Sequence, residues 1–296
     1  VWGYSGSRAT NKNRETLMEN EKYKGNCKNF DYLKEVRHRY RWVSKLRPQI
    51  LAIPLYKILK PYEHRRIVEI DRLRLFLDPF SHLGGILLDE GKYEPRVRKI
   101  IEDYLVAGSI FLDIGANEGY YAALASQRVG QEGFVIAVEP QSALVGVIEI
   151  NLLLNGTSPY RIFQNVLAVQ AGVKMPLNLY PLSNTGAASL VRRYRWWWRR
   201  EIVFTTTAME ILMATPVEKI DLVKVDVEGY EYEVVRSLWP LLEKKTVNAL
   251  LVDYHLSILS KLSISVLDIE KGILERGGKA IWREREKGGY VLYRFN

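Results

Sequence analysis

Short apolar runs alternate with stretches of helical character from residue 109 to the C-terminus, and this alternation constrains the fold more than any other feature. Five of the runs have the length and apolar content of buried strands: 109–115, 133–140, 161–169, 219–227 and 247–255. Helices are predicted between them, up to Asn155 and at 228–238 and 261–276. Parallel strands need long crossovers, usually helices, so the pattern predicts an open, mostly parallel sheet covered by helices on both faces.

The last two predicted strands pair with each other. Residues 280–285 and 289–295 flank a Glu-Lys-Gly-Gly turn, which is typical of a β-hairpin. A closing antiparallel hairpin is absent from the plain nucleotide-binding fold and present in class I methyltransferases. We therefore expect an α/β fold of the class I methyltransferase (Rossmann-like) type, with a mostly parallel seven-stranded sheet and a terminal antiparallel hairpin.

The positive charge of the chain is concentrated at its N-terminus. The net charge is +9, yet residues 1–66 carry 16 Lys and Arg against 6 Asp and Glu, whereas the remainder carries 27 against 28. Pro48 and Pro54 interrupt the apolar residues of this segment, which predicts short helices. We therefore divide the chain into a basic, partly helical extension at 1–66 and a methyltransferase-fold domain at 67–296.

The turn after the first of these strands has the composition of a nucleoside-binding site. It contains Asp113, Gly115, Asn117 and Gly119, and its glycines permit a tight turn and a close approach of a ligand to the backbone. Glu139 ends the second strand, where a carboxylate can accept hydrogen bonds from both hydroxyls of a ribose. Dinucleotide sites need a glycine where Asn117 stands, and Asp113 would repel a pyrophosphate. A ligand with a sulfonium, an ammonium group and no phosphate fits instead, which predicts S-adenosylmethionine as the cofactor.

Several blocks of the sequence match the pattern of one known family. They are FLDIGANEGYYAAL at 111–124, VIAVEPQ with the later pair Asn151 and Asn155, IDLVKVDVEGYEYEVV at 220–235, and GKYEP at 91–95. Together they resemble the FkbM family of methyltransferases that use S-adenosylmethionine. The resemblance implies a Rossmann-like sheet, S-adenosylmethionine as methyl donor, and O-methylation of a hydroxyl on a sugar or secondary metabolite. It also implies that Glu94 lies near the cofactor.

Polar residues follow the fourth and fifth predicted strands, where ligands bind in folds of this type. Methyl transfer to oxygen requires an aligned acceptor and a group that takes the hydroxyl proton. Asp226 is the first candidate for orienting the acceptor or taking its proton, and Lys224 is expected to pair with a carboxylate. Glu228 either takes part in catalysis or caps the following helix, and His255 is either a base or a structural residue. A divalent ion between Asp226, Asp253 and His255 is conceivable, but the spacing does not require one, and no metal is predicted.

Two segments, 192–200 and 1–66, are each compatible with more than one kind of binding partner. Residues 192–200 hold five Arg and three of the seven Trp, which suit packing on the domain surface, stacking on a sugar or RNA bases, or docking at a membrane interface. The basic extension suits a solvated helical face, nucleic acid or an anionic surface. We predict a small-molecule or glycan acceptor, with peripheral contact to a membrane or anionic surface through 1–66 and 192–200. The alternatives are an RNA methyltransferase and a non-catalytic scaffold that binds S-adenosylmethionine at a membrane.

The location of the protein follows from three further features. Charged residues interrupt every apolar stretch, and the N-terminus lacks the apolar core of a signal peptide. Cys27 is the only cysteine, so no disulfide forms within the chain. The sequence therefore predicts a cytoplasmic protein.

Overall fold

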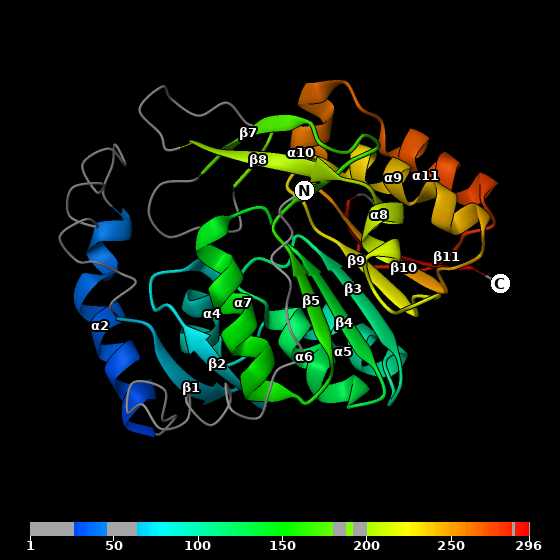
Figure 1. Ribbon diagram of the computed structural model, residues 1–296. Coiled ribbons are helices and arrows are strands. Elements are labelled where there is room, and N and C mark those ends of the chain that lie inside the picture. Colours follow the sequence, from blue (N-terminus) through cyan, green and yellow to red (C-terminus); the bar gives the residue numbers. More distant parts are fainter. Residues whose placement is uncertain (1–26, 46–63, 180–187, 192–199, 286–287, 296) are drawn as a thin grey trace.

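The computed structural model describes residues 27–45, 64–179, 188–191, 200–285 and 288–295. Its centre is a seven-stranded sheet with the strand order β11-β12-β10-β9-β3-β4-β5 (Figure 1). The strands are β3 (Ile110–Ile114), β4 (Phe134–Val138), β5 (Tyr160–Phe163), β9 (Leu222–Val225), β10 (Ala249–Tyr254), β11 (Lys279–Arg283) and β12 (Gly289–Arg294). Neighbours from β10 to β5 run parallel, whereas β12 is antiparallel to both β10 and β11. This is the strand order of the class I methyltransferase fold, so the predicted fold class and terminal hairpin are confirmed.

The strand order creates a crevice at one edge of the sheet. β4 and β5 lie on one side of β3, whereas β9 and β10 lie on its other side. The connections that leave β3 and β9 therefore run in opposite directions along the sheet. Open α/β sheets bind ligands at the place where the strand order reverses in this way, outside the carboxyl ends of the strands.

Helices cover both faces of the sheet because successive side chains of a strand point to opposite faces. On β3, Phe111 packs into the core of one face and Leu112 into the core of the other. The first face is covered by α5 (Pro95–Tyr104), α6 (Tyr120–Val129) and α7 (Ser142–Asn155), and the second by α8 (Ala208–Met213), α9 (Glu231–Glu243) and α11 (Val266–Glu275). None of the helices in the described ranges combines the length and the apolar character that crossing a membrane requires.

The segment before the sheet packs onto the first face. β1 (Arg66–Ile70) and β2 (Leu73–Leu77) form an antiparallel hairpin, which α4 (His82–Glu90) follows. The helix α2 (Cys27–Lys45) lies beside β1 (Figure 1). Leu33 of α2 is fully buried in the same core as Phe111. The region predicted as an extension at 1–66 therefore contributes a helix to the core, and its boundary with the domain at 67–296 stays a prediction.

The run at 161–169 does not form the single strand that its composition predicts. It divides into β5 and β6 (Val166–Leu167), and β6 pairs with β8 (Arg200–Thr206) in a separate three-stranded sheet that also holds β7 (Lys174–Asn178). The polar residues Gln164 and Asn165 separate the two parts. The chain leaves the main sheet at this point, and the second sheet lies over the crevice.

Two helices begin later than the sequence predicts. The helix expected from residue 228 begins at Glu231, because Glu228 and Gly229 have φ angles of 49° and 98°. Such left-handed residues do not continue a right-handed helix, so Glu228 is not the helix cap. The helix expected from residue 261 begins at Val266. Ser265 directly precedes it, and its side chain accepts a hydrogen bond from the backbone N–H of Leu267.

Candidate active site

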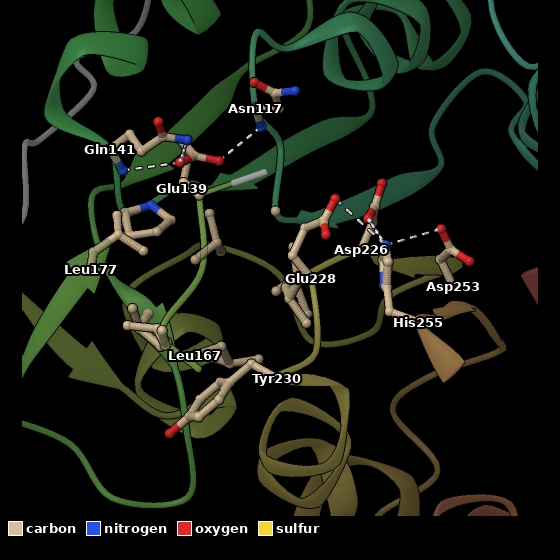
Figure 2. A pocket seen from close by; sticks show the side chains of 18 of the residues that line it. Asn117, Glu139, Gln141, Leu167, Leu177, Asp226, Glu228, Tyr230, Asp253 and His255 are labelled. Carbon is tan, nitrogen blue, oxygen red and sulfur yellow. Dashed lines mark hydrogen bonds and ion pairs between the residues drawn. The ribbon is translucent and has the colours of Figure 1, made fainter. Parts of the chain in front are cut away.

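A cleft opens at the carboxyl ends of β3, β4, β9 and β10 (Figure 2). It encloses about 1040 Å³ of space, part of which is open to solvent. Seven of the nine site residues predicted from the sequence line it: Glu94, Gly115, Asn117, Glu139, Asp226, Glu228 and His255. The other two, Asp113 and Gly119, do not line the cleft. The sheet therefore brings together residues from most of the length of the domain.

Glu139 stands at one end of the cleft and is only 3 % exposed. Its carboxylate accepts hydrogen bonds from the backbone N–H of Asn117 at 2.9 Å and from the backbone and side-chain N–H groups of Gln141 at 3.0 and 3.1 Å. Burial raises the pKa of Glu139 to about 7, although these hydrogen bonds act to lower it. The apolar side chains of Leu167 and Leu177 line the same end (Figure 2). A carboxylate beside an apolar wall suits a nucleoside, because the ribose hydroxyls can donate to the carboxylate while the base packs on the wall.

The turn after β3 is held by close packing. Gly115 has a φ angle of 81°, and a Cβ at this position would lie 1.8 Å from the carbonyl oxygen of Asp226. Only glycine fits such a position. Asp113 is fully buried behind the turn, and Gly119 begins α6, where a Cβ would lie 3.0 Å from the Cα of Ile148. Asp113 and Gly119 therefore support the turn from behind.

A buried lysine connects β3 with β9. Lys224 is 1 % exposed, and its Nζ lies 3.2 Å from Oδ2 of Asp226 and 3.7 Å from Oδ1 of Asp113. Burial acts to lower the pKa of Lys224, but the carboxylates of Asp226, Asp113 and Glu94 raise it above its usual value. The lysine is therefore charged, and it pairs with carboxylates as the sequence predicted.

Glu94 reaches this polar group from the segment before α5. Its Oε2 accepts a hydrogen bond from the hydroxyl of Tyr121 at 2.5 Å. The hydroxyl of Tyr290, on β12, lies 3.3 Å from the same oxygen and 3.2 Å from Oδ2 of Asp226. Burial raises the pKa of Glu94 above its usual value. The terminal hairpin thus contributes a tyrosine between two carboxylates of the cleft.

His255 lies among four carboxylates at the other end of the cleft from Glu139 (Figure 2). Its Nδ1 lies 2.7 Å from Oε1 of Glu231, a residue with no exposed surface. Its Nε2 lies 3.6 Å from Oε1 of Glu228, 3.7 Å from Oδ2 of Asp253 and 3.9 Å from Oδ1 of Asp226. The buried partner thus orients the imidazole so that Nε2 faces the three carboxylates that line the cleft.

The neighbours of these groups set their charge states. Burial acts to raise the pKa of Asp226, but Lys224, His255 and the hydrogen-bond donors around it lower that pKa below its usual value. Burial acts to lower the pKa of His255, but the hydrogen bond with Glu231 and the nearby carboxylates raise it to about 10. Burial and the charge of Asp226 raise the pKa of Asp253 to about 7. At neutral pH, Asp226 is therefore anionic and His255 is cationic.

Glu231 and Tyr290 are two residues of the site for which the sequence predicted no role. Glu231 lies within the EGYEYE segment, where its only local signal is its position at the start of a helix. Tyr290 carries no local signal, because it reaches Glu94 only through the pairing of β12 with β10. The pair Asn151 and Asn155 lies outside the cleft and binds the backbone of β2 through the N–H groups of Phe76 and Arg74.

Comparisons with known proteins point to one family. A family model described as the methyltransferase FkbM domain matches residues 113–278, which is more than half of the chain. Among solved structures, the chain is similar to a putative rRNA methylase from Clostridium thermocellum, with 10% identity over 68% of this chain and 95% of that chain and a TM-score of 0.40. It is also similar to a precorrin-6y C5,15-methyltransferase from Geobacter metallireducens, with 13% identity over 68% and 89% of the two chains and a TM-score of 0.37. No curated protein matches the sequence at a significant level.

Proposed function

Because the chain belongs to the FkbM methyltransferase family, we propose that it is an O-methyltransferase whose acceptor is a hydroxyl group on a sugar, a glycan or a secondary metabolite. Methyl transfer, and S-adenosylmethionine as the cofactor, follow from the family and the fold. The oxygen atom as methyl acceptor and the class of molecule that carries it are the proposed part.

The residues of the cleft fit S-adenosylmethionine. In our proposal, the carboxylate of Glu139 accepts hydrogen bonds from the ribose hydroxyls, and Gly115 and Asn117 bring the backbone of the turn close to the ligand. Glu94 places negative charge where the cofactor carries its sulfonium and ammonium groups. When bound, the cofactor supplies the electrophilic methyl group. Asp113 and Gly119 act indirectly, because they hold the turn in place from behind.

The observation that carries the proposal is the concentration of hydrogen-bond acceptors at the end of the cleft away from Glu139. The carboxylates of Asp226, Glu228 and Asp253 all line this end. Hydroxyl groups donate hydrogen bonds to carboxylates, so an acceptor with several hydroxyls can satisfy several of these oxygens at once. This arrangement favours a polyhydroxylated acceptor.

Methylation of a hydroxyl must also remove one proton from the acceptor. Lys224 keeps Asp226 anionic, so Asp226 is a weak base, and we assign it the role of accepting a hydrogen bond from the reacting hydroxyl and orienting it. Glu228 lines the cleft beside His255, and we assign it the role of taking the proton. His255 is already protonated at neutral pH and holds the surrounding carboxylates by its charge.

RNA methylation is the second candidate function. The basic residues of 1–66 and 192–200 favour an anionic partner. The carboxylates of Asp226, Glu228 and Asp253 argue against this function, because they would repel the phosphates next to a target nucleotide. We propose instead that these basic segments bring a cytoplasmic enzyme to a membrane or another anionic surface. Residues 192–199 and most of 1–66 lie outside the described residues.

The proposed function is tested with purified full-length protein and S-adenosylmethionine labelled with ¹³C in its methyl group. Simple glycosides, polyols and phenols form one set of acceptors, and cellular RNA forms the other. We expect S-adenosylhomocysteine to form with at least one hydroxylated acceptor, and the labelled methyl carbon of the product to show the NMR shift of a methoxy group. Methyl transfer to RNA alone, or to nitrogen or carbon, contradicts the proposal. A protein that binds the cofactor and never transfers its methyl group supports the scaffold alternative.

A further inference from the structure

Three potential metal ligands from two neighbouring strands converge at the acceptor end of the cleft. Within the described ranges, Asp226, Asp253 and His255 each offer one ligand atom, and these atoms all lie within 4.8 Å of one another. Two ligands of one metal ion, each about 2.1 Å from it, lie roughly 3 to 4.3 Å apart. Side-chain movements of a few tenths of an ångström therefore suffice to bring the three atoms around one ion.

The imidazole is oriented as a metal ligand would be. Glu231, which lies outside this group of three, holds Nδ1 of His255 at 2.7 Å and also accepts a hydrogen bond from the backbone N–H of Gly229 at 2.9 Å. Histidines that bind metals almost always donate their other ring N–H to a carboxylate or carbonyl in this way. A metal ion at Nε2 would take the place of the proton that this nitrogen carries in the metal-free protein, because metal binding to an imidazole displaces its proton. The Nε2 of His255 lies 3.7 Å from Asp253 and 3.9 Å from Asp226. Both separations are too long for hydrogen bonds and suit two ligands of one ion.

Negative charge exceeds positive charge around this point. The carboxyl groups at this end of the cleft and in its support are those of Glu94, Asp226, Glu228, Glu231 and Asp253. Apart from His255 itself, the cation that faces them is Lys224, which already pairs with Asp226 and with Asp113. Carboxylates brought together with too few cations repel one another, and a divalent ion would relieve that repulsion.

From this arrangement we propose that Asp226, Asp253 and His255 bind one divalent first-row transition-metal ion. One imidazole nitrogen and two carboxylate oxygens suit ions such as Mn²⁺ or Zn²⁺. Three protein ligands leave coordination positions open toward the cleft, as in catalytic rather than structural metal sites. The sequence alone predicted no metal, because the spacing of these residues along the chain does not show that they meet.

The role of the ion rests on the proposed function, whereas its binding does not. An ion at this position can bind an oxygen of the acceptor and lower the pKa of the reacting hydroxyl, which makes that oxygen a better nucleophile at neutral pH. Glu228 remains outside the group of ligands and takes the hydroxyl proton, so the assignment of the base is unchanged.

The test uses the full-length protein after removal of metals with a chelator, in the absence of cofactor and acceptor. MnCl₂ is titrated into the protein, and free Mn²⁺ is followed by its electron paramagnetic resonance signal. We expect one Mn²⁺ to bind per chain, and we expect Asp253→Asn and His255→Gln to weaken binding by roughly 100-fold or more. Glu231→Gln, which alters the support of His255, is expected to weaken binding by about 10–100-fold. Asp103→Asn is the matched control, because it removes an exposed carboxylate on α5 that pairs with Lys99, and it should bind Mn²⁺ as the wild type does.

A second measurement needs no variant. In the wild type, bound Mn²⁺ should show electron spin echo modulation from an imidazole nitrogen, so misfolding of a variant does not affect the test. Lack of saturable binding, lack of the nitrogen signal, or full binding in both folded ligand variants overturns the proposal. O-methylation that proceeds undiminished in chelator also contradicts the role of the ion but leaves the proposed function intact. Conversely, Mn²⁺ binding without any methylated hydroxyl supports the site and contradicts the proposed function.

Discussion

At the scale of single residues, the cleft shows how neighbours set the charge of a carboxyl group. Asp226 and Asp253 end adjacent parallel strands, yet their pKa values shift in opposite directions. Asp226 lies 3.2 Å from the ammonium group of Lys224, which offsets the cost of burial, whereas Asp253 has no such partner at that distance among the described residues. Asp226 is thus suited to orient a hydroxyl as an anion.

Asp226→Asn tests the orienting role. The substitution keeps the size of the side chain and its hydrogen-bonding reach but removes its negative charge. We expect turnover to fall by roughly 10²–10⁴-fold, the range for a positioned acid–base group. Affinity for S-adenosylmethionine, measured by calorimetry, should change far less, because Glu139 lies at the other end of the cleft. A joint loss of melting temperature and cofactor affinity would instead indicate a structural role, and full activity would exclude Asp226 from catalysis.

Glu139 gives a prediction for the pH dependence of ligand binding. Its pKa is raised to about 7 in the free protein, and ribose hydroxyls stabilise the ionised carboxylate, so bound ligand lowers that pKa. Binding then releases a proton below about pH 7, and affinity should rise with pH by up to about tenfold between pH 6 and pH 8 before it levels off. The probe is 5′-methylthioadenosine, which has the ribose but no titrating amino acid, and the measurement is calorimetry. Glu139→Gln should bind more weakly with no pH dependence, and a wild type without pH dependence contradicts the prediction.

At the scale of elements, the site depends on how closely β3 and β9 approach each other. The turn after β3 passes over the end of β9 at Gly115, where a Cβ would lie 1.8 Å from the carbonyl oxygen of Asp226. The same approach lets Lys224 on β9 reach Asp113 on β3. The cofactor turn and the proposed acceptor group are therefore one packed unit, and a change in the turn should disturb both.

Gly115→Ala tests this coupling. The methyl group would add a steric clash to a left-handed backbone, so we expect a loss of about 1–3 kcal/mol or more in the free energy of unfolding. We also expect cofactor affinity and turnover to fall together. Gly108→Ala is the matched control, because Gly108 has a similar φ angle of 86° with no atom within 4 Å of the added Cβ. The control should lose only about 1 kcal/mol, and equal effects in both variants would show that the backbone angle, not the close approach, sets the cost.

At the scale of the whole molecule, the described part of the N-terminal region belongs to the core of the domain. Leu33 of α2 is fully buried, whereas the residues that line the cleft begin at His82. Arg65, just before β1, forms a buried ion pair at 2.6 Å with Glu118 in the turn after β3. The described part of the N-terminal region, residues 27–45 and 64–66, thus supports the first face of the sheet and one side of the turn and is not among the residues that line the cleft.

Removal of residues 1–60 should therefore lower stability without removing cofactor binding. The loss of Leu33 alone, in full-length Leu33→Ala, should cost about 2–5 kcal/mol in the free energy of unfolding, since it leaves a cavity in the core. We expect the truncated protein to melt at a lower temperature and, where folded, to bind S-adenosylmethionine with affinity close to that of the full chain. Thermal melting and calorimetry check the two parts. A folded truncated protein that fails to bind the cofactor would show that the N-terminal region belongs to the site.

The sequence by itself determined the features that depend on short stretches of chain. Apolar runs predicted most strands of the main sheet, because a buried strand must be apolar along its length. The turn residues Gly115 and Asn117 predicted a tight turn at the end of β3, because left-handed angles and close approach restrict the residue type locally. The resemblance added the position of Glu94, which lines the cleft. The strand pattern placed Asp226 at the end of the fourth predicted strand, and the structure shows it in the cleft.

Only the tertiary structure decided which of these residues meet. Tyr290 and Glu94 are 196 positions apart, and they come together because β12 lies between β11 and β10 in the sheet. Glu231 became the partner of His255 because two left-handed residues delay the start of α9, an effect that the helical pattern of the sequence does not show. Local patterns set what each segment forms, whereas contacts between segments depend on the order in which strands pair, and that order is a property of the whole packed chain.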